Sequence, residues 1–234
     1  MIYIQKKDDS NIAHHFDCSC AMYGAIEQDL PYKLISYDEI EKYSNLIKTN
    51  LFVGSTEFMS KVFSFMNKSP KVPKNSNRSC RILTLKQAKE FSKERSIFIK
   101  PTKIKLFTGF VLDQYSYNCI NILPDNTEVM VYDPFIESIS SEWRLYINNN
   151  KIVDARNYAG DFMITPDWNY AKQVLEENRS NFPISYTIDI GILKSGKNEV
   201  IEFNDMWAIG NYGIPNDLYI RLLKDRYWEI IRHD

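Results

Sequence analysis

The sequence predicts an α/β protein with α+β order in its C-terminal part, and two patterns indicate this class. Near the N-terminus, an apolar strand at residues 51–54 leads through Ser55, a residue type that caps helices, into apolar residues at helical spacing. This order is typical of half a β-α-β unit. In the C-terminal half, residues 142–158 and 186–205 alternate apolar and polar residues on both sides of a polar turn, as β-hairpins do.

The first 76 residues are predicted to form a small α/β domain. Strands are expected at residues 2–4, 32–36 and 51–54, and a helix follows the last of them. The segment 68–80 combines prolines with small polar residues and has no periodicity, which is typical of a linker. We therefore predict a domain boundary near residue 77, with one domain at 1–76 and a second region at 77–234.

The second region is predicted to begin with a helix that Thr84 caps, because apolar residues recur at helical spacing as far as Phe91. The elements expected after it are a strand at 96–101, extended segments at 106–112 and 128–136, a hairpin at 142–158, a helix at 168–178, a hairpin at 186–205 and a helix at 216–232. The last helix has one apolar face, so we expect it to pack against a core.

Charge and hydropathy exclude several classes of partner. The 29 basic and 30 acidic residues leave a net charge of −1, so nucleic-acid binding is not expected. No apolar run is long enough to span a bilayer and no signal-peptide pattern is found, so we expect a cytoplasmic protein without a membrane partner. The cysteines are expected to be free thiols, and they are Cys18, Cys20, Cys80 and Cys119.

The hairpin at 186–205 offers oxygen ligands for a divalent cation. Facing residues in an antiparallel pair have a constant sum of residue numbers, so a turn near Gly196 places Asp189 opposite Glu202 or Asn204. Facing side chains project to the same side, so all three share one face. Mg²⁺ prefers carboxylate oxygens together with nucleotide phosphates. The alternative is an ordinary hairpin with a solvated polar face. The opposite face is predicted to consist of Ile188, Ile190, Ile192, Ile201 and Phe203.

Five motifs follow one another in a characteristic order. They are residues 98–101 (Phe-Ile-Lys-Pro), the glycine-bearing loop 105–109, the strand 129–132, residues 142–144 (Glu-Trp-Arg), and Asp189 followed by residues 202–204 (Glu-Phe-Asn). This order resembles the ATP-grasp family over essentially the whole chain. It is most similar to a small, compact clade with a paired Lys and a Glu-Trp-Arg strand, often encoded by bacteria and their phages. The resemblance implies an ATP-grasp fold preceded by a small Rossmann-like domain.

The resemblance also implies ATP and Mg²⁺ as cofactors. The residues implied to bind the nucleotide are Lys100, Lys105, Gly109, Val131, Tyr132 and Glu137, and those implied to bind Mg²⁺ are Asp189, Glu202 and Asn204. The chemistry of Lys100 agrees, because an ammonium at the end of a buried strand can reach the phosphates, although a surface lysine is the alternative. Lys103 competes with Lys105 for the second phosphate contact. Val131 and Tyr132 would contact adenine through their backbone.

Arg144, Lys105 and Glu142 are expected to act in catalysis. The planar fork of Arg144 suits an acyl phosphate or the γ-phosphate. Glu142 lies on the same strand face and would orient Arg144 or bind a lysine, with a plain cross-strand ion pair as the alternative. Arg156 either binds a substrate carboxylate or is solvated. The loop at 205–213 either lines an acceptor pocket or forms a plain glycine-rich turn.

The function that this resemblance implies is that of an ATP-dependent carboxylate–amine ligase. An amino acid, peptide or protein carboxylate would form an acyl phosphate, and an amine would then displace phosphate, leaving ADP and inorganic phosphate. One alternative is a catalytically inactive nucleotide-binding regulator or adaptor. Another is a nucleotidyltransferase that carries adenylate on Lys100, although such enzymes need Lys-x-Asp-Gly and Lys100 is followed by Pro-Thr-Lys.

A local group of soft ligands is the one hint of zinc in the sequence. It consists of His14, His15, Cys18 and Cys20. Zinc sites usually separate their two ligand pairs along the chain, and no second group lies nearby. We therefore expect partly buried thiols and incidental histidines.

Overall fold

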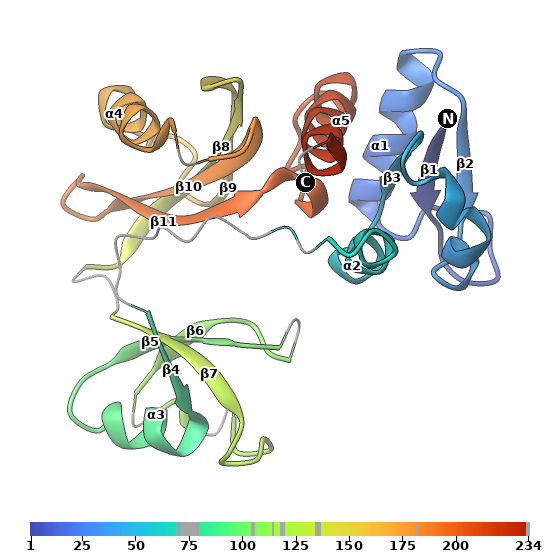
Figure 1. Cartoon of the computed structure of the whole chain (residues 1–234). Coiled ribbons are helices and arrows are strands. Elements are labelled where there is room, and N and C mark those ends of the chain that lie inside the picture. Colours follow the sequence, from blue (N-terminus) through green and yellow to red (C-terminus); the bar gives the residue numbers. More distant parts are fainter. Residues whose placement is uncertain are drawn as a thin grey trace. The chain divides into compact units, whose positions relative to one another are not determined.

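The chain divides into two compact units in the computed structural model (Figure 1). One unit is Met1–Lys74 together with Ile139–Asp234, and the other is Asn75–Ser138. The structure describes residues 1–68, 70, 80–103, 106–113, 115–117, 120–133, 137–180 and 182–232. Most of the predicted linker at 68–80 lies outside these residues, so the division into 1–76 and 77–234 stays a prediction.

The N-terminal part of the first unit is a small parallel sheet with helices. Its elements are β1 (Ile2–Gln5), α1 (Phe16–Glu27), β2 (Tyr32–Ile35), the 3₁₀ helix η1 (Asp38–Leu46), β3 (Leu51–Val53) and α2 (Thr56–Ser64). The strand order is β2-β1-β3, and both pairs are parallel. Helix α2 begins where predicted, because the side chain of Ser55 accepts a hydrogen bond from the backbone N–H of Phe58 at 3.2 Å.

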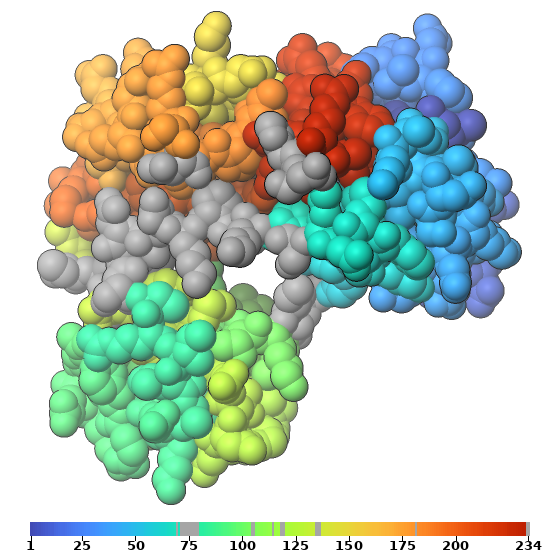
Figure 2. All heavy atoms as spheres, in the orientation of Figure 1, coloured from blue at the N-terminus to red at the C-terminus, as the bar shows by residue number. Residues whose placement is uncertain are grey.

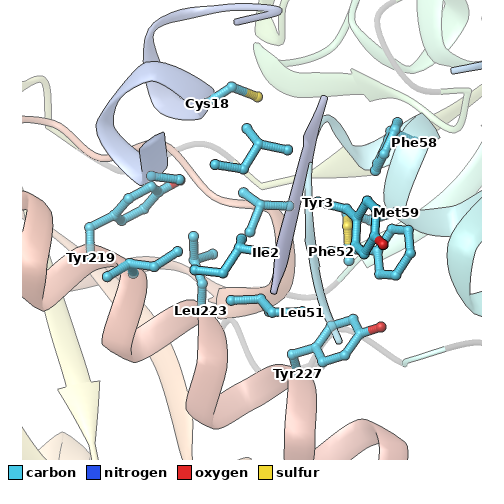
Figure 3. Packing of buried hydrophobic residues seen from close by; sticks show 14 of the residues in the cluster. Ile2, Tyr3, Cys18, Leu51, Phe52, Phe58, Met59, Tyr219, Leu223 and Tyr227 are labelled. Atoms are coloured by element: carbon cyan, nitrogen blue, oxygen red, sulfur yellow. The ribbon is translucent and has the colours of Figure 1, made fainter. Parts of the chain in front are cut away.

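The helix α5 (Asn216–Arg232) completes the core of this N-terminal sheet. Figure 2 shows α5 in red directly against the blue N-terminal residues. In Figure 3, Tyr219 and Leu223 of α5 lie on the side of the sheet to which Ile2 points. Tyr3 and Phe52 lie on the opposite side, where their rings stack with centroids 4.8 Å apart. The apolar face predicted for the last helix is therefore buried against the first strand of the chain.

Replacing Leu223 by alanine is expected to lower the free energy of unfolding by about 2–5 kcal/mol, because it opens a cavity in this shared core. Leu223 is 2% exposed. Urea denaturation measures the change. Arg221→Ala, at an exposed position of the same helix, is the control and should stay within about 0.5 kcal/mol of the wild type. Equal losses in both variants would contradict a buried interface at Leu223.

The rest of the first unit is an antiparallel sheet covered by one helix. Its elements are β8 (Ile139–Asn148), β9 (Lys151–Gly160), α4 (Trp168–Asn178), β10 (Ser185–Leu193), β11 (Asn198–Asp205) and the 3₁₀ helix η3 (Met206–Ala208). The strand order is β11-β10-β8-β9. Asn149 and Asn150 form the tight turn between β8 and β9 and both have positive φ, at 48° and 57°, as a two-residue hairpin turn requires. Both predicted hairpins and the helix between them are confirmed.

One residue of the predicted apolar face lies on the other side of the hairpin. Ile188, Ile190 and Phe203 pack against α4 as expected, but the core position near them belongs to Val200. The register shifts between Asp189 and Ile190, so Ile201 is the extra residue of a β-bulge. The assignment of Ile201 to the apolar face was therefore wrong, because strict alternation does not survive a bulge.

The second unit is a smaller sheet with one helix on it. Its elements are β4 (Cys80–Thr84), α3 (Leu85–Phe91), β5 (Ile97–Pro101), β6 (Phe110–Leu112) and β7 (Glu128–Tyr132), in the strand order β4-β7-β5-β6. Thr84 and Gln87 form a reciprocal capping box at the start of α3, as the sequence predicts for Thr84. Leu85 and Ala88 of α3 pack with one face of the sheet, so the residues of its other face are left for a site.

Candidate active site

Four charged side chains form one row across the sheet of the first unit. Glu202 of β11 faces Asp189 of β10, Asp189 also faces Arg144 of β8, and Arg144 faces Arg156 of β9. Facing residues in antiparallel ladders project to the same side, so the four side chains share one face. The row has two carboxylates at one end and two guanidinium groups at the other. We call it the charged row.

The two central members of the charged row form a buried, bidentate ion pair. Arg144 donates from Nε to Asp189 Oδ1 at 2.8 Å and from Nη2 to Asp189 Oδ2 at 2.7 Å. The residues are 5% and 1% exposed. Burial raises the pKa of Asp189 to about 6, with Glu202 adding to the increase and Arg144 opposing it. Two of the nitrogen atoms that the sequence assigns to a phosphate thus contact Asp189 in this structure.

Asn204 lies beside both carboxylates. Its Nδ2 donates to Glu202 Oε1 at 3.2 Å and to Asp189 Oδ2 at 3.4 Å. A half-turn of the amide would bring Oδ1 to the same position. The three residues predicted to bind Mg²⁺ therefore converge.

The donor set fits a hard divalent cation. The carboxylates of Asp189 and Glu202 repel each other, as the raised pKa of Asp189 indicates, and Arg144 supplies one positive charge against two negative ones. A cation on their oxygens would remove that repulsion. No group of three or more His, Cys, Asp or Glu side chains converges among the described residues. A metal at this position would thus have two carboxylates and an amide as its protein ligands.

Two tyrosines complete this part of the site, and sequence reasoning missed both. Tyr158 donates from its hydroxyl to Glu142 Oε2 at 2.7 Å. Its ring stacks on that of Tyr212, with centroids 5.1 Å apart, and the guanidinium of Arg144 lies 4.6 Å from the Tyr212 ring centre. Glu142 is therefore held by Tyr158 in this structure. The alternation of β9 could have indicated Tyr158, because it lies two residues beyond Arg156.

Tyr212 owes its position to the loop that follows β11. It has a positive φ of 47°, which is uncommon for a bulky residue and marks a conformation that the surroundings impose. Asn211 fixes the loop, because its Oδ1 accepts from the N–H of Gly213 at 2.7 Å and its own N–H donates to Asp17 Oδ1 at 2.7 Å. The hydroxyl of Tyr146 donates to the Asn211 carbonyl at 2.6 Å. The sequence carries no signal for this conformation beyond the flanking glycines.

The start of this loop has a structural partner. Asp205 accepts from Nε and Nη2 of Arg226 in α5, at 2.6 Å each. The same arginine donates from Nη1 to Glu229 at 2.8 Å. Asp205 is therefore held in a buried ion pair with α5, away from an acceptor pocket. Trp207 is half-buried, and its Nε1 has no hydrogen-bond partner in the part of the chain that the structure describes.

The second unit brings three of the predicted nucleotide residues onto one face of its sheet. Lys100 and Tyr132 lie on the face opposite α3, where Nζ of Lys100 is 5.8 Å from the ring centre of Phe98. A side chain at Gly109 would approach the Lys100 Cγ to 2.8 Å, so glycine allows the loop to pass directly over this lysine. The side chain of Val131 is buried under α3, so its backbone remains for a ligand.

Two predicted residues are less completely placed. Lys105 lies outside the described residues, and Lys103 is exposed. Glu137 is described and half-buried, but the three residues before it are not described.

The cysteines of the soft-ligand group lie inside helix α1. Cys18 and Cys20 are buried, and burial raises the pKa of Cys18 to about 12 and that of Cys20 to about 11. Thiols with such values stay protonated near neutral pH, and the thiolate is the form that binds metals.

Comparison with known proteins assigns the family. Residues 76–222 match a family described as an ATP-grasp domain, the second family of its clade, and this match covers more than half of the chain. The chain belongs to the ATP-grasp superfamily. As an ATP-grasp protein it is an ATP-binding ligase of the class that forms carbon–nitrogen bonds. No curated protein matches the sequence.

Solved structures of ATP-grasp enzymes share the fold. One is the ATP-grasp ligase PsnB complexed with minimal precursor, with a TM-score of 0.54 at 11% identity over 96% of this chain and 98% of that chain. Another is N5-carboxyaminoimidazole ribonucleotide synthetase from Thermotoga maritima, with a TM-score of 0.59 at 10% identity over 96% and 75%. A third is the macrocyclase MdnC bound with precursor peptide MdnA from Microcystis aeruginosa MRC, with 0.53 at 9% over 95% and 98%.

These likenesses confirm an α/β ATP-grasp fold for the chain. Among the described residues, no helix of this ATP-grasp protein is both long and apolar enough to cross a membrane.

Proposed function

We propose that this ATP-grasp ligase joins a carboxylate to an amine through an acyl phosphate. In the first step a carboxylate oxygen of the substrate attacks the γ-phosphorus of ATP, and ADP leaves. In the second step an amine attacks the acyl carbon, the bond from that carbon to the phosphate oxygen breaks, and inorganic phosphate leaves. The amine loses one proton as the amide forms.

The charged row is the observation that supports this proposal best. Phosphoryl transfer is accelerated chiefly by positioning and by charge stabilisation. The row provides oxygens for a cation at Asp189 and Glu202 and positive groups for an anion at Arg144 and Arg156 on a single rigid face. Nη1 of Arg144 makes no hydrogen bond to Asp189, and this is the atom that we assign to the transferred phosphate.

The proposal assigns the remaining residues as follows. ATP would be bound by Lys100, Lys105, Gly109, Val131, Tyr132 and Glu137, and Mg²⁺ by Asp189, Glu202 and Asn204. Bound Mg²⁺ would neutralise charge on the phosphate oxygens. Lys105 would add a positive charge to the phosphates. Glu142, held by Tyr158, would face the incoming amine.

The substrate carboxylate is proposed to belong to an amino acid, a peptide or a protein. PsnB and MdnC are each described in complex with a precursor or a precursor peptide, which supports a peptide. We propose the cytoplasm as the compartment and expect no membrane or nucleic-acid partner. A nucleotide-binding regulator without catalysis is the second candidate.

The test replaces the unknown amine by hydroxylamine, a small nucleophile that converts acyl phosphates to hydroxamates. The full chain is incubated with ATP, Mg²⁺ and hydroxylamine, and with amino acids, dicarboxylates or a peptide library as the carboxylate. We expect ADP and a hydroxamate that both depend on one carboxylate, measured by chromatography and mass spectrometry against a reaction without carboxylate.

Two other results would contradict the proposal. Formation of AMP, or of adenylate on Lys100, would favour a nucleotidyltransferase. Binding of ATP without consumption in the presence of every carboxylate would favour the regulator.

A further inference from the structure

Arg156 stands at the basic end of the charged row, beside Arg144. Their Cα positions face each other directly across β8 and β9. Two positive charges in this arrangement repel each other unless negative groups lie nearby. Each guanidinium has one carboxylate, which is Asp189 for Arg144 and Asp154 for Arg156. A second anion between the two arginines would meet positive charge from both sides.

The two ion pairs differ in what they leave for a ligand. The side chain of Arg144 is 6% exposed, whereas that of Arg156 is 38% exposed. Nη2 of Arg156 donates to Asp154 Oδ2 at 3.0 Å. Nε of Arg156 lies 2.9 Å from Asp154 Oδ1, yet it is buried and makes no hydrogen bond with any described residue, because the N–H is not aligned with that oxygen. Arg156 therefore keeps a donor that its own carboxylate does not satisfy.

The neighbouring residues leave room for a flat, charged group near the two arginines. A side chain built at Gly210 would have Nη1 of Arg144 as its nearest atom, at 3.7 Å, so no described side chain crowds this nitrogen from that direction. The stacked rings of Tyr158 and Tyr212 form an aromatic wall over Arg144. Tyr212 is 47% exposed, so the wall is open to solvent.

We propose that Arg156 binds the carboxylate of the substrate and keeps hold of the acyl phosphate formed from it. A planar fork matches the planar carboxylate, and pairing with an anion would satisfy the donor that Asp154 leaves unaligned. The inference rests on the proposed function, because it names the residue that recognises the acyl group in that reaction. It separates the roles of the two arginines, with Arg156 selecting the acyl substrate and Arg144 tied to the metal carboxylate Asp189.

Acetyl phosphate, the simplest acyl phosphate, is the probe for this site. It is titrated against the full chain in the presence of saturating ADP and Mg²⁺, and its binding is followed by ³¹P NMR. We expect Arg156→Ala to weaken acetyl phosphate binding about tenfold or more, and Arg156→Lys to restore part of it. The affinity for ADP should be the same in all variants. Arg179→Ala, which removes an exposed arginine of α4, is the matched control and should bind like the wild type.

Asp154→Asn separates ligand binding from a purely structural ion pair. If Arg156 only stabilises β9 through Asp154, then Asp154→Asn and Arg156→Ala should have the same effect. If Arg156 binds the acyl group, Asp154→Asn removes a competing negative charge and should tighten acetyl phosphate binding, by about threefold. The melting temperature of each variant reports whether the fold is retained.

Three outcomes are decisive. Acetyl phosphate binding that is equal in wild type and Arg156→Ala, or that is absent in wild type while ADP binds, would overturn the inference and leave the proposed function standing. A chain that does not bind ADP would overturn both. A weaker affinity of Arg156→Ala for ADP, with acetyl phosphate unchanged, would assign Arg156 to the nucleotide and overturn its role in acyl recognition.

Discussion

Replacing Glu202 by glutamine is expected to reduce substrate-dependent ADP formation about a hundredfold or more. The variant keeps the size of the side chain but removes one of the two negative charges that face each other on β10 and β11. A site with one carboxylate holds Mg²⁺ poorly, and the phosphates then lose a neutralising charge. The measurement is the rate of ADP release over a range of Mg²⁺ concentrations, with Glu177→Gln on the exposed surface of α4 as the control.

The dependence on Mg²⁺ decides whether the metal assignment is right. If Glu202 binds the cation, part of the lost rate should return at high Mg²⁺ in Glu202→Gln, and the control should follow the wild-type curve. A Glu202→Gln enzyme with the wild-type rate and the wild-type Mg²⁺ curve would exclude this residue from the metal site.

Replacing Arg144 by methionine is expected to lower the free energy of unfolding by about 3–5 kcal/mol. The change leaves Asp189 buried without its positive partner, next to Glu202. Urea denaturation measures the loss. The double replacement Arg144→Met with Asp189→Leu should recover most of it, because no charge then remains buried without a partner. A double variant as unstable as the single one would show that packing, and not the unpaired carboxylate, causes the loss.

The same variant should respond to pH in a known direction. The pKa of Asp189 in the folded protein is already raised to about 6 from its ordinary 3.8, and loss of Arg144 removes the group that opposes this increase. A raised folded-state pKa means that the folded state takes up a proton more readily than the unfolded state. The stability deficit of Arg144→Met should therefore be smaller at pH 5 than at pH 8.

Most of the fold could be predicted because its signals are local. Ser55 and Thr84 are helix caps, and alternating strands around short turns gave both C-terminal hairpins. The contact between α5 and β1 could not be predicted, because an amphipathic helix shows that it has an apolar face and not which element will cover it. Ile201 was misplaced for a related reason, since nothing in residues 198–205 announces a bulge.

The candidate site was predictable as far as register could take it. The constant-sum rule placed Asp189 opposite Glu202, and the structure has that pairing. The partner of Arg144 was not predictable, because its planar fork fits a phosphate and a carboxylate equally well. Tyr212 depends on a backbone conformation that Asn211 and Asp17 hold across a long sequence separation, which no local pattern encodes.

The shared core of β1 and α5 sets an order of events during synthesis of the chain. The hydroxyl of Tyr227 donates to the carbonyl of Ile47, a residue 180 positions earlier. The N-terminal sheet therefore waits for α5 before its apolar face is covered, and closing so long a loop is slow. The unit at 75–138 draws its own core from its own residues and can form while the ribosome is still working. Until α5 emerges, the face of β1 that carries Ile2 is a surface that a chaperone would have to protect.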